Sequence, residues 1–145
     1  MWSAAAILVC ALSMLGRSER HFHPINLVEV APLGASPNAE GFVTRNPDTI
    51  HIVTSSAAFR EATRAGNRCG NRAAVAKVAS VLVHEEWHLK NGPDERGAYS
   101  AQLTELAALG FDEHSHVYFG VKRSMLARLK RPPQIASLGD SGRPR

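Results

Sequence analysis

The chain has 145 residues, of which 44% are apolar and 21% are charged, and its formal net charge is +4. This length corresponds to one domain with one hydrophobic core, which leaves little room for a separate substrate domain. Much of the excess positive charge lies near the C-terminus, but no nucleic-acid fold signature accompanies it, so we expect no nucleic-acid partner.

Residues 1–20 contain an apolar run, Ala4–Leu15, that charged residues follow. The run is too short for a comfortable membrane span, but it has the length of a signal-peptide core. We therefore predict a signal peptide or short membrane anchor, with possible membrane association and a secreted, periplasmic or membrane-anchored location. The alternative is a helix that packs on the domain. Because Cys10 lies inside this run, cleavage would leave Cys69 without an intrachain partner, and we expect no disulfide.

Short extended segments and one short helix are predicted for the first half of the chain. Several prolines divide residues 21–48 into loops and extended pieces, of which residues 25–30 alternate well enough for a strand. Phe42–Thr44 and Ile50–Thr54 are rich in β-branched residues and are joined by a short Asn-Pro-Asp turn, which favours a hairpin. Residues 55–66 form a short helix between a serine N-cap and a glycine stop.

Helices dominate the second half. Residues 72–92 run without a breaker until an Asn-Gly pair, residues 93–110 follow with a proline in the first position, and residues 114–130 form a last helix. The Pro-, Gly- and Ser-rich residues 132–145 predict a disordered basic tail. We therefore expect one α+β domain over residues 21–131, in which a sheet of roughly two to four strands packs against the long helix and two further helices lie behind it.

The segment HEEWH places His84 and His88 four residues apart on the long predicted helix. Both imidazoles then project from one helix face, and this spacing lets both reach one zinc ion. Glu85 is rotated roughly 100° from His84, so it can hold a zinc-bound water and take its proton instead of acting as a ligand. The alternative is two ordinary helix histidines, which would leave Glu85 and the acidic residues beyond the helix unexplained.

With Val81 three residues before the first histidine, this motif resembles the active-site helix of the zincin metallopeptidases. The resemblance covers residues 49–110. Glu86 and Lys90 depart from it, because zincins prefer uncharged residues between the glutamate and the second histidine and a hydrophobic residue two positions after it. The resemblance implies that the strand Ile50–Thr54 is the edge strand that lines the substrate cleft.

A catalytic zinc site needs a third protein ligand and one open position. In the gluzincin branch this ligand is a glutamate on a following helix, often with a small residue three positions later, and Glu95 with Ala98 matches. In the metzincin branch the ligand lies six residues after the second histidine, which is Asp94 here, but the glycine expected midway is Asn91. We prefer Glu95, because Asp94 is well placed to cap the helix. The predicted ligands of Zn²⁺ in this minimal gluzincin-like site are His84, His88 and Glu95.

Several other polar and aromatic residues accompany the motif. Tyr99 shares a helix face with Glu95, so it either stabilises an oxyanion or ligand carboxylate or packs in the core. Gln102 lies further along this face and is interpreted as a supporting or structural polar group. His51 lies on the predicted edge strand and is a candidate to face the cleft. The remaining positions are interpreted as packing or solvated residues: Trp87, His114 and His116.

The sequence predicts a zinc-dependent hydrolase that cleaves peptide or amide bonds in a peptide or protein substrate. Glu85 would accept a proton from the zinc-bound water and return it to the leaving amine. A second hypothesis is a non-catalytic zinc-binding structural module or degenerate zincin-like module, which the small size favours because peptidases usually need a second wall to form a cleft. A third is a membrane-associated adaptor without metal.

Overall fold

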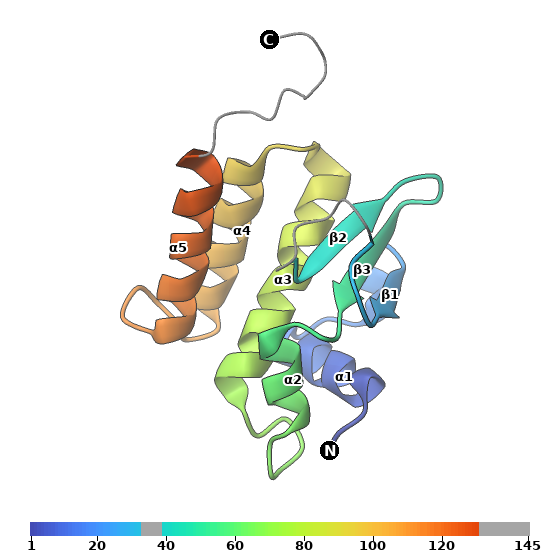
Figure 1. The fold of residues 1–145 in the computed structure, drawn as a ribbon, viewed down its shortest axis with the longest axis vertical. Coiled ribbons are helices and arrows are strands. Elements are labelled where there is room, and N and C mark those ends of the chain that lie inside the picture. Colours follow the sequence, from blue (N-terminus) through green and yellow to red (C-terminus); the bar gives the residue numbers. More distant parts are fainter. Residues whose placement is uncertain (33–38, 131–145) are drawn as a thin grey trace, which may run out of the picture.

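The computed structural model describes residues 1–32 and 39–130 (Figure 1), so the predicted tail lies outside the described residues. The fold is α+β, with five α-helices and one three-stranded sheet in this part of the chain. The predicted helices and strands occur close to their expected bounds. The elements are α1 (Ala4–Leu15), a 3₁₀ helix η1 (Glu19–His21), β1 (Ile25–Val28), β2 (Gly41–Thr44), β3 (Thr49–Val53), α2 (Ala57–Thr63), α3 (Arg72–Asn91), α4 (Glu95–Ala108) and α5 (His116–Lys130).

The sheet has the strand order β1-β3-β2. β2 pairs with β3 in antiparallel orientation, which confirms the predicted hairpin, and β1 pairs with β3 in parallel orientation on the other side. The prediction that Ile50–Thr54 forms the edge strand is therefore wrong, because β3 is central and β2 is an edge. Ile50 and Ile52 lie on the buried face of β3, but local strand pattern carries no information on which strand acquires a second neighbour.

Helix α3 is the central element of the fold. Figure 1 shows α4 and α5 on one side of α3 and the sheet on the other, with α1 and α2 near its N-terminal half. Its N-cap Asn71 accepts a hydrogen bond from the backbone N–H of Ala74, and it ends before Gly92 at φ 101°. Small side chains allow close packing on two sides: Ala76 contacts the α4–α5 cluster, whereas Val78 belongs to the main core.

Helix α1 is part of the main core, with Ile7 and Ala11 fully buried. The packing of α1 agrees with the alternative interpretation of residues 1–20, a helix that packs on the domain. The signal peptide or membrane anchor, and cleavage of residues 1–20, stay predictions. The expected absence of a disulfide is wrong, since Cys10 of α1 bonds Cys69 of the α2–α3 loop, with 5.5 Å between their Cα atoms. Packing of α1 against α2 and α3 brings the two cysteines together, although they are 59 residues apart in the sequence.

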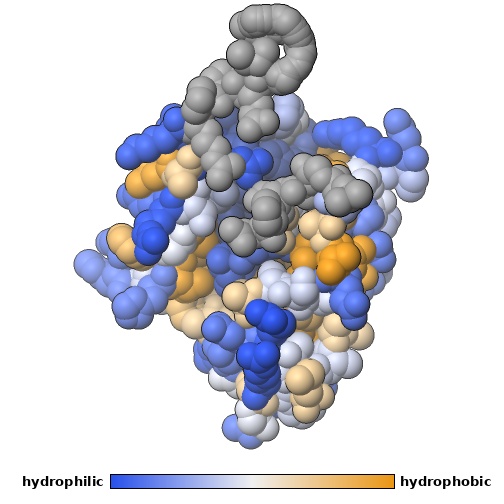
Figure 2. Space-filling view, viewed as in Figure 1, coloured by the Kyte–Doolittle hydropathy of each residue, from blue (hydrophilic) through white to orange (hydrophobic). Residues whose placement is uncertain are grey.

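Some apolar side chains are exposed on the surface. On the face shown in Figure 2, they lie in small groups among hydrophilic residues. The large exposed apolar residues include Val9 on α1 and Phe119 and Leu126 on α5. Isolated apolar residues of this kind are common on globular proteins. Among the residues that the structure describes, no helix has both the length and the apolar character that crossing a bilayer requires.

Candidate metal centre

The structure brings His84, His88 and Glu95 together at the junction of α3 and α4. The Nε2 atoms of both histidines lie 3.1 Å from the same carboxylate oxygen, Glu95 Oε1. One potential ligand atom from each residue lies within 4.8 Å of the others, so the group could hold a metal ion. Both histidines are buried, and Glu95 is partly buried. The three predicted ligands therefore converge on one point.

The short connection between α3 and α4 positions Glu95. Gly92 has a positive φ of 101°, and Asp94 caps α4 by accepting a hydrogen bond of 3.1 Å from the backbone N–H of Arg96. Asp94 is thus occupied as the helix cap, as predicted, and Glu95 faces the histidines. The two helices also approach closely, because a Cβ at Gly97 would overlap the indole of Trp87. Trp87 is a packing residue, as interpreted.

The hydrogen bonds at Nδ1 determine what each Nε2 presents to Glu95. His84 Nδ1 lies 2.8 Å from Gln102 Oε1, and His88 Nδ1 lies 2.9 Å from the carbonyl oxygen of Gly92. Amide oxygens only accept hydrogen bonds, so both Nδ1 atoms donate. A neutral imidazole then directs its Nε2 lone pair at the Glu95 carboxylate, which is repulsive unless a proton or a cation lies between them.

Two separations between the ligand atoms are close to those of a tetrahedral zinc site. In tetrahedral geometry with zinc–ligand bonds of about 2.0–2.1 Å, two ligand atoms lie about 3.3 Å apart. The observed separations between Glu95 Oε1 and the two Nε2 atoms, 3.1 Å each, are close to this value. Two imidazole nitrogens and one carboxylate oxygen are also donors that zinc accepts. The three residues could therefore hold a metal ion, and their donor atoms are ones that zinc accepts.

The second carboxylate oxygen of Glu95 is held by α5. Arg128 Nη2 lies 2.9 Å from Glu95 Oε2. Burial raises the pKa of Glu95, but hydrogen bonds from His84 and His88 and the charge of Arg128 outweigh this effect and hold the pKa well below its ordinary value. The hydrogen bond to Glu95 raises the pKa of His88, against the opposing effect of burial. The sequence did not predict this contact, since no local pattern connects Arg128 to Glu95.

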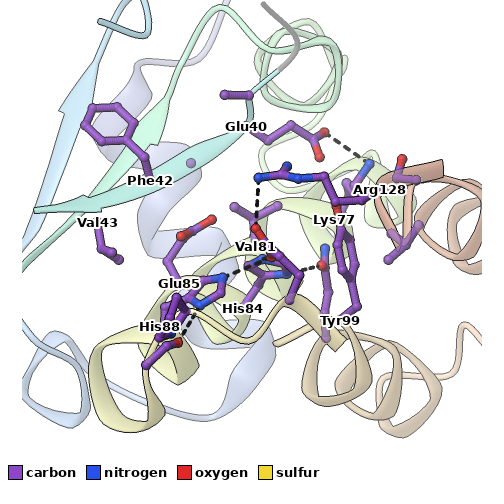
Figure 3. A pocket seen from close by; sticks show the side chains of 18 of the residues that line it. Glu40, Phe42, Val43, Lys77, Val81, His84, Glu85, His88, Tyr99 and Arg128 are labelled. Atoms are coloured by element: carbon purple, nitrogen blue, oxygen red, sulfur yellow. Dashed lines mark hydrogen bonds and ion pairs between the residues drawn. The ribbon is translucent and has the colours of Figure 1, made fainter. Parts of the chain in front are cut away.

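A cavity of about 550 Å³ opens beside the cluster and is lined by β2, α3, α4 and α5. In Figure 3, Glu85 lies between the two histidines and Val43 of β2, with Tyr99 and Arg128 on the opposite side. The Glu85 side chain is buried, and its burial raises its pKa, against the lowering effect of the charges of His84 and His88. A buried carboxylate that lines a cavity beside potential metal ligands is a candidate for proton transfer.

Gly41 allows β2 to lie directly on α3. A Cβ at this position would come within 2.9 Å of Val81 Cγ1 and 3.1 Å of Glu85 Cγ. These distances are shorter than an ordinary carbon–carbon contact of about 3.5–4.0 Å. β2, the edge strand that lines the cavity, therefore packs directly against Glu85.

Tyr99 lines the cavity and also packs against a potential ligand. Its ring meets the ring of His84 edge-on, with centroids 4.6 Å apart. Burial, followed by the negative charge of Glu95, raises the pKa of Tyr99, so its hydroxyl keeps its proton at neutral pH. The two interpretations of Tyr99 are thus compatible: its ring is a packing surface, and its hydroxyl is a potential hydrogen-bond donor to a ligand in the cavity.

His51 is not placed as the sequence suggested. It lies on the central strand, on the sheet face opposite to the buried Ile50 and Ile52, where it stacks on Phe42. Its ring nitrogens lie within hydrogen-bond distance of Asn26 Nδ2 and Thr44 Oγ1. Within the described residues, the cavity lining does not include it, so the expectation that it faces the cleft is wrong.

Two departures from the zincin pattern have a structural cause. The buried carboxylate of Glu86 accepts a hydrogen bond of 2.8 Å from the backbone N–H of His23 and lies 2.8 Å from His23 Nδ1. Lys90 lies 3.6 Å from the same carboxylate. Glu86 therefore anchors the segment before β1 to α3. The Glu86 carboxylate thus interacts with His23 and Lys90, on the side of α3 away from the metal cluster.

The solvated loop position expected for His114 is confirmed, since its side chain is exposed. His116 is the first residue of α5 and is also exposed.

Comparisons of the chain with protein-family models, curated proteins and solved structures found no match.

Proposed function

We propose that the chain is a zinc-dependent hydrolase of the zincin type that cleaves peptide or amide bonds, with Zn²⁺ bound by His84, His88 and Glu95. The observation that carries this proposal is the convergence of two Nε2 atoms on Glu95 Oε1, while acceptor oxygens occupy both Nδ1 atoms. This donor set leaves one coordination position for water or substrate. A bound Zn²⁺ supplies a Lewis acid that polarises a carbonyl and lowers the pKa of water.

Glu85 is proposed as the general base and acid. It is separate from the three ligands, it lines the cavity, and burial raises its pKa toward the range in which a carboxylate both takes and returns a proton. One carboxylate oxygen of Glu85 would take a proton from water and then deliver it to the leaving amine. Tyr99, whose raised pKa keeps it protonated, would donate a hydrogen bond to the developing oxyanion.

The shape of the cavity supports a peptide substrate. β2 is an edge strand, and an extended peptide can add to such a strand through backbone hydrogen bonds. Across from β2, α4 and α5 supply the second wall, with Tyr99 and Arg128 in the lining. The presence of two walls favours the hydrolase over the non-catalytic module, which the small size of the chain had suggested.

The location we propose is secreted, periplasmic or membrane-anchored. The disulfide between Cys10 and Cys69 supports it, because disulfides form and persist mainly in oxidising compartments. The alternative function is a non-catalytic zinc-binding or degenerate zincin-like module. The ion pair between Arg128 and Glu95 favours this alternative, because it also fits a cluster that only connects α3, α4 and α5.

Metal analysis combined with a peptide-cleavage assay tests the proposal. The wild-type protein should bind equimolar zinc, His88→Ala should lose it, and the exposed His114→Ala should serve as a control that keeps it. Glu85→Gln should retain zinc and lose cleavage by a factor of about 10² to 10⁴. Loss of zinc in Glu85→Gln would show that the roles are wrongly assigned. Equimolar zinc without any cleavage by the wild type would establish the non-catalytic module instead.

A further inference from the structure

A line of buried polar groups runs from the interior of α3 to the metal cluster. Ser80 is fully buried, and its hydroxyl donates a hydrogen bond of 2.7 Å to the carbonyl oxygen of Lys77. The side-chain amide of Gln102, also buried, donates from Nε2 to Ser80 Oγ at 3.0 Å. Gln102 Oε1 lies 2.8 Å from His84 Nδ1. The line therefore connects α3 to α4 and back to a ligand on α3.

The direction of each hydrogen bond follows from the one before it. Because the only hydroxyl proton of Ser80 is donated to the Lys77 carbonyl, Ser80 Oγ can only accept from Gln102. This requirement points the NH₂ group of Gln102 at Ser80 and its oxygen at His84. The oxygen accepts only, so His84 Nδ1 carries the proton and its Nε2 lone pair faces Glu95.

We propose that Ser80 sets the metal affinity of the site by fixing the orientation of the Gln102 amide and, through it, the tautomer of His84. This inference rests on the proposed zinc site. Ser80 lies one helical turn before His84 and is not one of the three ligands, so it acts as a positioning residue.

Removal of the Ser80 hydroxyl would release the amide. Without an acceptor at position 80, the amide of Gln102 can rotate and direct its NH₂ group at His84 Nδ1. That orientation stabilises the tautomer with the proton on Nε2, which leaves Nε2 without a lone pair for the metal. Mutation of the hydrogen-bond partners of metal-ligating histidines typically lowers metal affinity by about 10–100-fold. We therefore expect Ser80→Ala to weaken zinc binding by about tenfold or more.

A carboxylate at position 102 removes the dependence on Ser80. Both of its oxygens accept a hydrogen bond from His84 Nδ1, so Gln102→Glu has no wrong orientation. A carboxylate is also a stronger acceptor than the Lys77 carbonyl, so the Ser80 hydroxyl turns to donate to it. Ser80→Ala should therefore weaken zinc binding strongly in the wild-type background and hardly at all in the Gln102→Glu background. Loss of packing alone would weaken binding equally in both backgrounds.

The experiment measures zinc affinity by chelator competition for the full chain and for Ser80→Ala, Gln102→Glu and the double variant. Thermal unfolding of the metal-free proteins checks that each is folded, and ¹⁵N NMR of the imidazole nitrogens reports the His84 tautomer. If Ser80→Ala does not fold, Gln102→Met, which lacks the acceptor, replaces it and should bind zinc at least tenfold more weakly than Gln102→Glu.

The possible failures are distinguishable. If the wild type binds zinc and folded Ser80→Ala binds it equally well, or if both backgrounds respond alike, the role of Ser80 is refuted and the zinc site stands. The same holds if the His84 tautomer is unchanged in Ser80→Ala. If the wild type binds no zinc, the proposed function is refuted together with this inference.

Discussion

Gly41→Ala is a perturbation that reaches Glu85 without altering any proposed zinc ligand. The added methyl group would lie 2.9 Å from Val81 Cγ1 and 3.1 Å from both Glu85 Cγ and the backbone oxygen of His51. Relief of these contacts to about 3.5–4.0 Å requires β2 or the Glu85 side chain to move by roughly 0.5–1 Å. Overpacking of this kind costs about 1–3 kcal/mol of folding free energy.

The functional effect of Gly41→Ala should exceed its effect on stability. A misplacement of about 1 Å at a reacting group lowers turnover by roughly 10²-fold, whereas His84, His88 and Glu95 belong to α3 and α4 and keep their positions. We therefore expect unchanged zinc content, a lower melting temperature and a large loss of peptide cleavage. Gly120→Ala on α5, where a Cβ meets no atom within 4 Å, is the matched control.

Three measurements follow on each Gly41 and Gly120 variant: zinc content, thermal unfolding and peptide cleavage. Full cleavage by Gly41→Ala would refute the argument that β2 and Glu85 share a tightly packed contact. Loss of zinc would show that β2 supports the ligands and not only Glu85. Gly120→Ala should retain cleavage and zinc, with stability equal to or above that of the wild type.

Two further predictions concern stability. Removal of the disulfide by the double substitution Cys10→Ala and Cys69→Ala should lower the free energy of unfolding by about 4 kcal/mol, the chain-entropy value for a loop of 59 residues, as denaturant titration can measure; an unchanged midpoint would contradict this. For the zinc-free protein, the lowered pKa of Glu95 contributes stability that is lost as pH falls below roughly 4.3. The raised pKa of His88 contributes stability that is lost as pH rises above roughly 6.5. The melting temperature of the zinc-free protein should therefore be highest between these two pH values. Zinc binding requires neutral histidines, so added zinc should move the highest melting temperature to higher pH. A dependence of melting temperature on pH that zinc leaves unchanged would argue against the site.

Short-range features of the sequence were sufficient to predict much of the site. The breaker-free segment predicted α3, and the helical repeat then placed His84 and His88 on one face. The short connection between the helices put Glu95 and Asp94 within reach of the histidines, and the suitability of Asp94 as a helix cap favoured Glu95 as the third ligand. Each of these inferences involves residues within a few helical turns, where backbone geometry leaves few alternatives.

What only the tertiary structure decided involves residues that are distant in the chain. The pairing of Cys10 with Cys69, the edge position of β2 and the contact of Arg128 with Glu95 each depend on which elements pack together. Local pattern shows that a strand or helix has an apolar face, but many partners can cover such a face. Which partner covers each face depends on how all the elements pack in the one core around α3. The position of each element there limits where the others can be buried.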